Sequence, residues 1–287
     1  MRVGVLRNGD RQLTAVQRHG QWFALDGDDG STPSTLEALT GAVPESAASE
    51  PLSDAYRPVV PHRPGRDVIC LGKNFRAHAE EFAAYSSEAE AIPKHPIVFT
   101  KAPEALCGAG DEIAVARQAT GALDYEAELG VIIGRSGAAI DASAAISHVA
   151  GYTIVNDVTA RDLQERHKQW FLAKSLPRST PIGPVVVTSD ELPQLEERTI
   201  SCSVNGEPRQ SAVLGDMIFG VAETISIISA LVPLVRGDII SMGTPAGVGI
   251  GFTPPKFLED GDEVVCTIEG IGELRNVVRF LDSIPNP

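Results

Sequence analysis

The sequence predicts a mixed α+β fold in which strands dominate and a few helices interrupt them. Short apolar runs rich in β-branched residues recur along the 287 residues, separated by Gly, Pro and Asn-Gly turn signals. Helical spacing of apolar residues is confined to a few segments. These do not alternate with strands in the regular way of a doubly wound fold.

Residues 1–62 are predicted to form a small N-terminal β domain with a linker, and residues 63–287 the main domain. The segment 2–26 alternates apolar and polar residues around Asn-Gly-type turns, as β-hairpins do. The segment 40–67 is rich in Ala, Ser, Glu and Pro, a composition typical of a linker or a wrapped loop.

In the main domain, apolar runs predict strands, and three segments predict helices. The predicted strands lie within residues 67–72, 96–102, 123–134, 151–160, 183–188, 199–210, 237–245 and 262–280. The predicted helices lie within residues 73–91, 141–150 and 217–232. Asp141 is a suitable N-cap for the second helix, and Asn205-Gly206 predicts a type I′ hairpin.

Composition excludes several classes of protein. A formal net charge of −14 leaves no basic stripe to neutralise the phosphates of a nucleic acid. No apolar segment reaches the ~20 residues that cross a bilayer. The opening MRVGVLRNGD carries no secretory signal, and we expect a cytoplasmic protein. Four cysteines without zinc-ligand spacing are expected to be reduced and buried: Cys70, Cys107, Cys202 and Cys266.

The segment LDYEAELGVIIG, residues 123–134, places Asp124, Glu126 and Glu128 at alternate positions before an apolar run. Alternate side chains of a strand share a face, so crowded carboxylates would repel and lose hydration near a core. Asp157 ends another apolar run. A hard divalent cation would remove the repulsion, whereas a hydrogen-bonded structural cluster is an equal alternative. Asp124 shares the face but lies farther out.

Five motifs in one order resemble the fumarylacetoacetate hydrolase family. They are LDYEAELGVIIG, GYTIVNDVTARDLQ, GDMIFGVAETI, GTPAGVG and LEDGDEVVCTIEGIGELRN. The resemblance spans residues 67–280, and residues 1–60 are similar to the small N-terminal domain of many members. It implies a compact mixed β roll as the catalytic domain, and a homodimer.

The resemblance also implies a set of site residues. The implied ligands of one Mg²⁺ or Mn²⁺ ion, with Ca²⁺ less favoured, are Glu126, Glu128 and Asp157. His78 and Glu81 are similar to an acid–base pair on a lid segment, with Glu80 as a competitor for the acid role. Lys174 matches a lysine near the metal. The implied substrate-binding residues are Arg161, Gln164 and Thr244.

Other positions support the site or depart from the family pattern. Lys101 matches a lysine that we expect to be structural or to support the ligands. Lys73 stands where many members have a small or apolar residue, and Phe75 replaces a Tyr. Ala173 replaces a Gly before Lys174. These departures leave the metal ligands intact and place the substrate preference in question.

The leading functional prediction is hydrolytic cleavage of a carbon–carbon bond in a 2,4-dioxo acid of the acylpyruvate type. His78, oriented by Glu81, would activate water, and Lys174 would help to neutralise the pyruvate enolate stabilised by the metal. Oxaloacetate decarboxylation, or keto–enol or double-bond isomerisation of a hydroxymuconate-type diacid, could use the same site. A non-catalytic binding protein with a structural metal is the alternative of another class. A phosphate-loop protein and a GxSxG serine hydrolase are excluded by the missing motifs.

Overall fold

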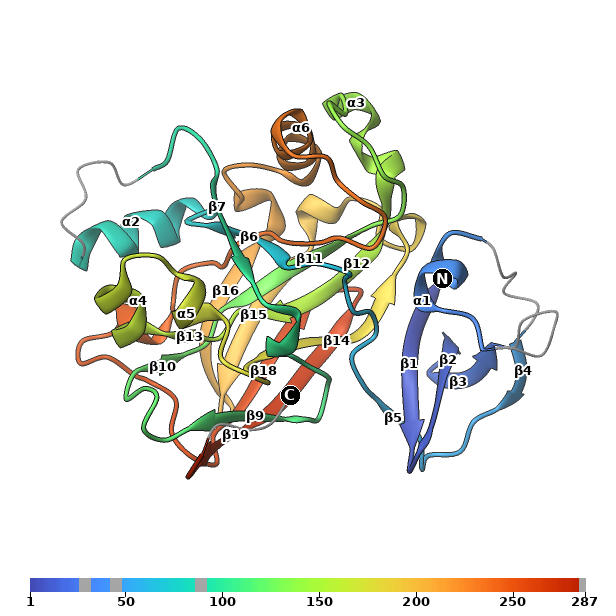
Figure 1. Cartoon of the computed structure of the whole chain (residues 1–287), viewed down its shortest axis with the longest axis horizontal. Helices are drawn as coiled ribbons and strands as arrows, with labels where there is room; N and C mark the ends of the chain where they lie inside the picture. Colours follow the sequence, from blue (N-terminus) through green and yellow to red (C-terminus); the bar gives the residue numbers. More distant parts are fainter. Residues whose placement is uncertain (26–31, 42–47, 86–91, 284–287) are drawn as a thin grey trace.

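Strands make up most of the computed structural model, which describes residues 1–25, 32–41, 48–85 and 92–283 (Figure 1). The strands of the N-terminal part are β1 (Arg2–Asn8), β2 (Arg11–Arg18), β3 (Gln21–Leu25), β4 (Ala48–Pro51) and β5 (Arg57–Pro58). Those of the first half of the main part are β6 (Val68–Gly72), β7 (Ile97–Lys101), β8 (Leu106–Cys107), β9 (Glu112–Ala116), β10 (Leu123–Asp124), β11 (Ala127–Ile133), β12 (Val149–Asn156) and β13 (Thr159–Ala160).

The remaining elements lie mostly in the second half of the chain. The last strands are β14 (Thr180–Val187), β15 (Thr199–Val204), β16 (Glu207–Val213), β17 (Ile239–Ser241), β18 (Glu263–Ile268) and β19 (Gly272–Leu281). The α-helices of the described residues are α1 (Thr35–Leu39), α2 (Arg76–Tyr85), α3 (Ala142–Ala145), α4 (Arg161–His167), α5 (Phe171–Lys174) and α6 (Val221–Leu231). The predicted strand-dominated α+β class is confirmed.

Two large sheets carry the architecture. The larger has the order β4-β3-β2-β1-β14-β12-β11-β17-β6-β7, with β5 beside β1 and β8 beside β14. The smaller has the order β16-β15-β18-β19-β9, and β10 pairs with β13 alone. Among the described residues, no helix is long and apolar enough to cross a membrane.

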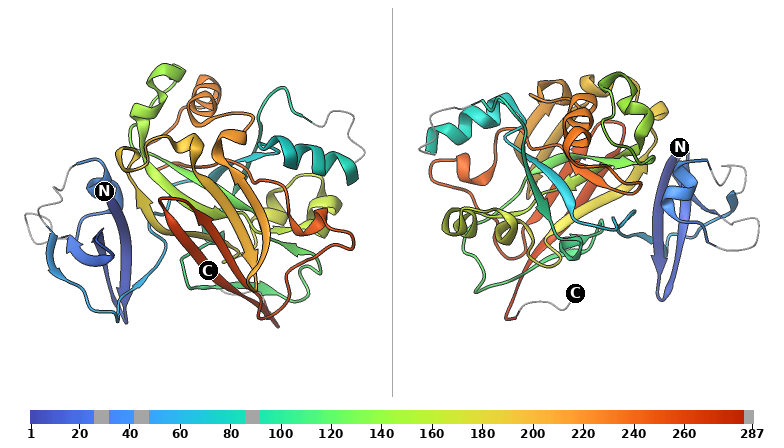
Figure 2. Two further views of the ribbon diagram at one scale, coloured as in Figure 1. Left: turned by 180° about the vertical axis from the view of Figure 1, so that it is seen from behind. Right: turned by 45° about the horizontal axis from the view of Figure 1, so that its top comes forward.

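The N-terminal strands extend the larger sheet. The predicted hairpins are present as β1–β2–β3, and β1 pairs antiparallel with β14, with Arg2 opposite Val187. Figures 1 and 2 show this part as a lobe at one side of the molecule. The predicted linker contains β4 and β5, while its residues 42–47 lie outside the described residues. The domain boundary after residue 62 stays a prediction.

The core explains the continuous apolar runs of the central strands. On β11, Leu129 and Val131 join a cluster that includes Ile200 of β15 and Cys266 of β18, between the two sheets. Ile132 of the same strand faces a second cluster on the other side of the larger sheet. Because both faces of β11 are buried, its sequence does not alternate between apolar and polar residues.

Two predicted helices are shorter than their sequence patterns. Helix α3 ends at Ala145 and a 3₁₀ turn follows, because β12 begins at Val149. Helix α6 begins at Val221 rather than at Met217, because the Asn74 side chain accepts from Phe219 N–H (2.9 Å) and donates to its carbonyl (3.0 Å). These bonds hold the preceding residues outside the helix. The predicted Asn205-Gly206 hairpin is confirmed, with φ values of 51° and 78°.

Candidate metal and substrate site

The antiparallel pairing of β11 with β12, two central strands of the larger sheet, brings two carboxylates together where β11 begins and β12 ends. Ala127 lies opposite Asn156, so Glu126 and Asp157 are adjacent just beyond the paired residues. Asp157 N–H donates to the Glu126 carbonyl (2.8 Å), and Glu126 N–H donates to Asn156 Oδ1 (3.0 Å). Backbone register, rather than side-chain attraction, therefore sets two like charges side by side.

Glu128, on β11, completes a buried acidic triad. One ligand atom from each of Glu126, Glu128 and Asp157 lies within 4.8 Å of the others. The three residues are at most 4% exposed. In the described part of the chain, no other group of three or more His, Cys, Asp or Glu residues meets this arrangement. The structure thus brings together the residues that the sequence analysis predicted as metal ligands.

Three cationic side chains surround the triad. Lys174 Nζ, at the end of α5, donates to Glu126 Oε2 (2.6 Å) and Asp157 Oδ2 (2.7 Å). Lys101 Nζ, at the end of β7, donates to Asp157 Oδ1 and to the Val158 carbonyl (3.0 Å). This placement agrees with the supporting role predicted for Lys101.

Arg161 is the third cation, and it binds a fourth carboxylate. Its Nη2 lies 2.7 Å from Glu126 Oε1, and its Nε donates to Asp124 Oδ2 (2.8 Å). Asp124 also accepts from Gly249 N–H (2.6 Å), so it anchors Arg161 and the neighbouring loop instead of joining the triad. Within this cluster, four carboxylates face three cations, and one negative charge remains.

Glu128 carries the excess charge. Burial, together with the nearby Asp157 and Glu126 carboxylates, raises the pKa of Glu128 well above its ordinary value. The groups that donate hydrogen bonds to it are uncharged: Ser241 Oγ and Gly243 N–H both donate to Oε2 (2.6 and 3.0 Å). Burial alone would raise the pKa of Glu126, but Lys174 and Arg161 outweigh it and bring the pKa to about 2.

The donor set fits a hard divalent cation. All three candidate ligands are carboxylates, the oxygen donors that Mg²⁺, Mn²⁺ and Ca²⁺ prefer. A carboxylate oxygen that already accepts one hydrogen bond retains capacity for another partner. A cation among these oxygens would also oppose the repulsion that raises the pKa of Glu128. A purely structural cluster would instead leave Glu128 protonated.

The predicted acid–base pair lies on α2, beside the triad. His78 is 4% exposed, and its Nδ1 lies 3.1 Å from Glu81 Oε2. Glu81 Oε1 accepts from Gly247 N–H (3.0 Å). Glu80, the competitor left open by the sequence, is exposed to solvent. Glu81 is therefore the carboxylate that orients the His78 ring, and Nε2 is the ring nitrogen available for a substrate.

The predicted substrate-binding residues Arg161, Gln164 and Thr244 line a small cavity beside the triad, together with His78. Gln164 Oε1 accepts from Arg161 Nη1 (3.2 Å). The Thr244 hydroxyl donates to the Ala127 carbonyl (3.0 Å) and accepts from Gln210 Nε2 (2.8 Å). Thr244 is thus fixed by the fold, and its contact with a substrate carboxylate stays a prediction. Gln210 was not predicted, because a polar residue in a strand carries no distinctive sequence signal.

Aromatic residues close the cavity and were also missed by the sequence analysis. Phe82, Phe99 and Trp170 line it, and the Phe99 and Trp170 rings pack edge to face with centroids 5.1 Å apart. A Cβ at Gly72 would lie 2.5 Å from the Trp170 ring. A glycine at the end of the apolar run 67–72 was the available signal of a close approach.

This cavity has a volume of about 20 Å³, room for a single water or ion. Ligand pockets usually measure about 300 Å³ or more, so a 2-oxo acid requires movement of the surrounding elements. Helix α2 contributes His78 and Phe82 to the lining. The lid role implied for this segment stays a prediction.

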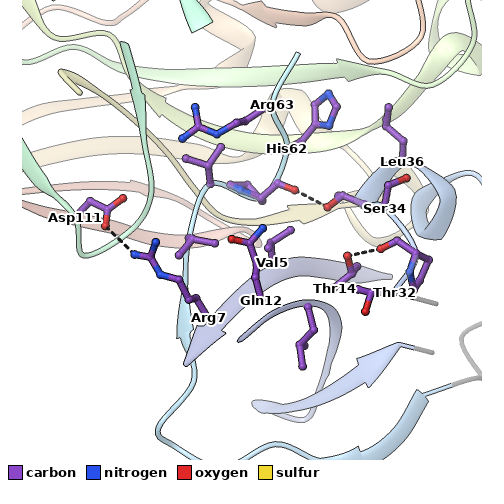
Figure 3. Close-up of a pocket in the computed structure, with 16 residues that line it drawn as sticks. Val5, Arg7, Gln12, Thr14, Thr32, Ser34, Leu36, His62, Arg63 and Asp111 are labelled. Carbon is purple, nitrogen blue, oxygen red and sulfur yellow. Dashed lines mark hydrogen bonds and ion pairs between the residues drawn. The ribbon is translucent and has the colours of Figure 1, made fainter. Parts of the chain in front are cut away.

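A larger cavity of about 520 Å³ lies between the N-terminal strands and the segment 59–63 (Figure 3). Among the described residues, one carboxylate lines this cavity, that of Asp111, and it pairs with Arg7 at 4.0 Å. The groups that line it are mostly neutral side chains, and the buried carboxylates described above are not among them. Size alone thus does not locate the chemistry, and the small cavity beside the triad remains the candidate site.

Comparisons with known proteins agree with this geometry. The chain matches the family "Fumarylacetoacetate (FAA) hydrolase C-terminal" over residues 67–279. It is 50% identical over 216 residues to "Oxaloacetate tautomerase YisK" of Bacillus subtilis (strain 168), covering 75% of this chain and 70% of that protein.

Solved structures are similar over almost the whole chain. A fumarylacetoacetate hydrolase from Exiguobacterium antarcticum is 37% identical, with a TM-score of 0.85 and coverage of 98% of this chain and 100% of that chain. A 5-carboxymethyl-2-hydroxymuconate delta-isomerase from Mycobacterium smegmatis is 29% identical, with a TM-score of 0.78 and coverage of 99% and 100%. The chain belongs to the fumarylacetoacetate hydrolase family.

Proposed function

We propose that the protein catalyses the keto–enol interconversion of a 2-oxo acid, with oxaloacetate as the leading substrate. The observation that carries the proposal is the buried His78–Glu81 pair beside a triad of carboxylates. A base next to a cation site is the equipment that proton abstraction beside a carbonyl requires. The relative named as an oxaloacetate tautomerase, 50% identical over 216 residues, supports this substrate.

The triad would hold one divalent cation, Mg²⁺ or Mn²⁺. When bound, the cation supplies Lewis-acid stabilisation of negative charge on the 2-oxo oxygen. His78 Nε2 would remove a proton from carbon 3 of the substrate, and Glu81 would stabilise the imidazolium that forms. Lys174, which donates to Glu126 and Asp157, adds a positive charge on the same side of the cavity. Return of the proton to oxygen gives the enol, and its return to carbon gives the ketone.

Hydrolytic cleavage of a 2,4-dioxo acid is the second candidate. The hydrolase from Exiguobacterium antarcticum, 37% identical over nearly the whole chain, favours it. The same His78 would then act on water rather than on a carbon acid. Hydroxymuconate-type isomerisation and oxaloacetate decarboxylation also stay open, since each begins with charge on the same oxygen.

The glycine-rich loop fixes the acid–base pair. Gly247 has φ of +99°, a conformation that favours glycine, and its N–H donates to Glu81 Oε1. A Cβ at Gly251 would lie 2.3 Å from the same oxygen and 2.6 Å from Glu81 Cδ. The backbone of this loop, whose sequence resembles a nucleotide-binding motif, therefore holds the Glu81 carboxylate in place.

The first prediction concerns cation binding. Saturating Mg²⁺ or Mn²⁺ should raise the melting temperature by about 5 °C, because a ligand bound only to the folded state stabilises it. Glu128→Gln should lose most of this shift, whereas without added cation it should melt no lower than the wild type, since the neutral amide replaces a carboxyl whose neutral form the raised pKa already favours. Thermal unfolding with EDTA and with each cation measures both effects. An equal Mg²⁺ shift in the two proteins would contradict the ligand assignment.

The second prediction concerns pH. In cation-free protein the raised pKa of Glu128 favours its protonated form, so its contribution to stability is present below its ordinary value of 4.5 and is lost as pH rises through the raised pKa. A cation must displace this proton. The Mg²⁺-induced rise in melting temperature should therefore increase as pH rises above 4.5 through the raised pKa. A shift independent of pH across this range would show that no proton is displaced.

The third prediction concerns the base. His78→Gln should lower the enzymatic rate of C3 proton exchange in oxaloacetate at least about 100-fold while retaining the Mg²⁺-induced stabilisation. His167→Gln, at an exposed position on α4, is the matched control. Proton NMR in D₂O, corrected for the spontaneous exchange, measures the rate. Wild-type exchange that persists in EDTA would contradict a catalytic role for the cation. Exchange at the full wild-type rate by His78→Gln would contradict the assignment of His78 as the base.

The fourth prediction concerns the loop. Gly251→Ala should lower kcat about 100-fold, because the added methyl group displaces the Glu81 carboxylate that orients His78. Gly220→Ala is the control, since a Cβ there has no neighbour within 4 Å and φ is −69°. Kinetics and thermal unfolding are compared for both variants. Unchanged kcat in a folded Gly251→Ala protein would show that the contact with Glu81 does not position the base.

A further inference from the structure

A fourth cation, Lys73, lines the cavity beside the triad. It follows Gly72, the last residue of β6, and is 6% exposed. Burial of a lysine is unfavourable because its ammonium loses hydration. Its backbone φ of +54° lies in the left-handed region, which disfavours any residue with a Cβ. A buried lysine in this conformation satisfies neither local preference, and such positions often mark functional sites.

The ammonium of Lys73 faces the lid helix. Its Nζ lies 4.2 Å from the centroid of the Phe82 ring on α2, a favourable cation–π distance. The same ring packs against His78, with centroids 6.5 Å apart at 68°. Lys73 is therefore connected through one aromatic ring to the helix that carries the base.

Three further cations lie around the triad. Lys101, Lys174 and Arg161 all contact carboxylates of the buried cluster, and so they hold the candidate ligands in place. Lys73 adds a positive charge that comes from the turn between β6 and α2, next to the lid. The cavity thus presents a cation on its lid side in addition to those around the triad.

We propose that Lys73 binds the second carboxylate of a 2-oxo dicarboxylic acid and so selects dicarboxylic over monocarboxylic substrates. This inference rests on the proposed function, because the triad and Lys174 are assigned to the 2-oxo end of the substrate. The far carboxylate of a short diacid then extends toward Lys73 and the Phe82 ring. A charged hydrogen bond in a site shielded from water discriminates strongly against a ligand that lacks the charge.

The test compares two substrates and three proteins. We measure kcat/KM for C3 proton exchange in oxaloacetate and in 2-oxobutanoate, with Mg²⁺ present and spontaneous exchange subtracted. The wild type should favour the dicarboxylate. Lys73→Met should reduce the ratio of the two values by about 10- to 100-fold, mainly through KM for oxaloacetate. Lys168→Met is the matched control, because Lys168 also has a left-handed φ (63°) but is exposed and lies outside the cavity.

The outcomes separate this inference from the function on which it rests. Exchange of neither substrate by the wild type would overturn the proposed function. Exchange with an unchanged ratio in folded Lys73→Met would overturn the role of Lys73 and leave the function standing. If Lys73→Met does not fold, Lys73→Gln and Lys73→Arg replace it. A ratio that falls in Lys73→Gln and is kept in Lys73→Arg supports the selection, and an unchanged ratio in folded Lys73→Gln refutes it.

Discussion

The excess negative charge of one buried cluster is the constraint on which the site depends. The β11–β12 register places Glu126 beside Asp157, and Glu128 follows on the same strand. Lys101, Lys174 and Arg161 compensate most of this charge but leave Glu128 with neutral partners. A purely structural network would be expected to avoid such a charge, because it raises the cost of burial. The imbalance has a direct use if the folded protein holds a cation.

The catalytic equipment is assembled from segments that lie far apart in the chain. Glu81 on α2 meets the loop around Gly247, and the Arg161 side chain joins Asp124 to Glu126. His78 on α2 lines a cavity too small for a substrate. The proposed function therefore requires α2 to move before a substrate binds, and its return would exclude water from the enol or enolate, which suits tautomerisation better than hydrolysis.

The sequence predicted the parts of this site that local patterns encode. Alternate acidic residues before an apolar run located Glu126 and Glu128, and an apolar run ending in Asp157 located the third carboxylate. The strand-dominated class followed from β-branched runs and turn signals. Helix α6 could not be bounded at Val221, because its start depends on Asn74, distant in sequence. Trp170 was missed for the same reason, since its place in the cavity requires tertiary contacts. The homodimer stays a prediction.

A crystal of the wild-type protein grown with Mn²⁺ gives the most direct measurement. An anomalous difference map should show one strong peak with oxygens of Glu126, Glu128 and Asp157 within about 2.0–2.6 Å, the range of hard-cation bonds. At saturating Mn²⁺, density that lacks this peak, or places it away from the three carboxylates, would contradict the account.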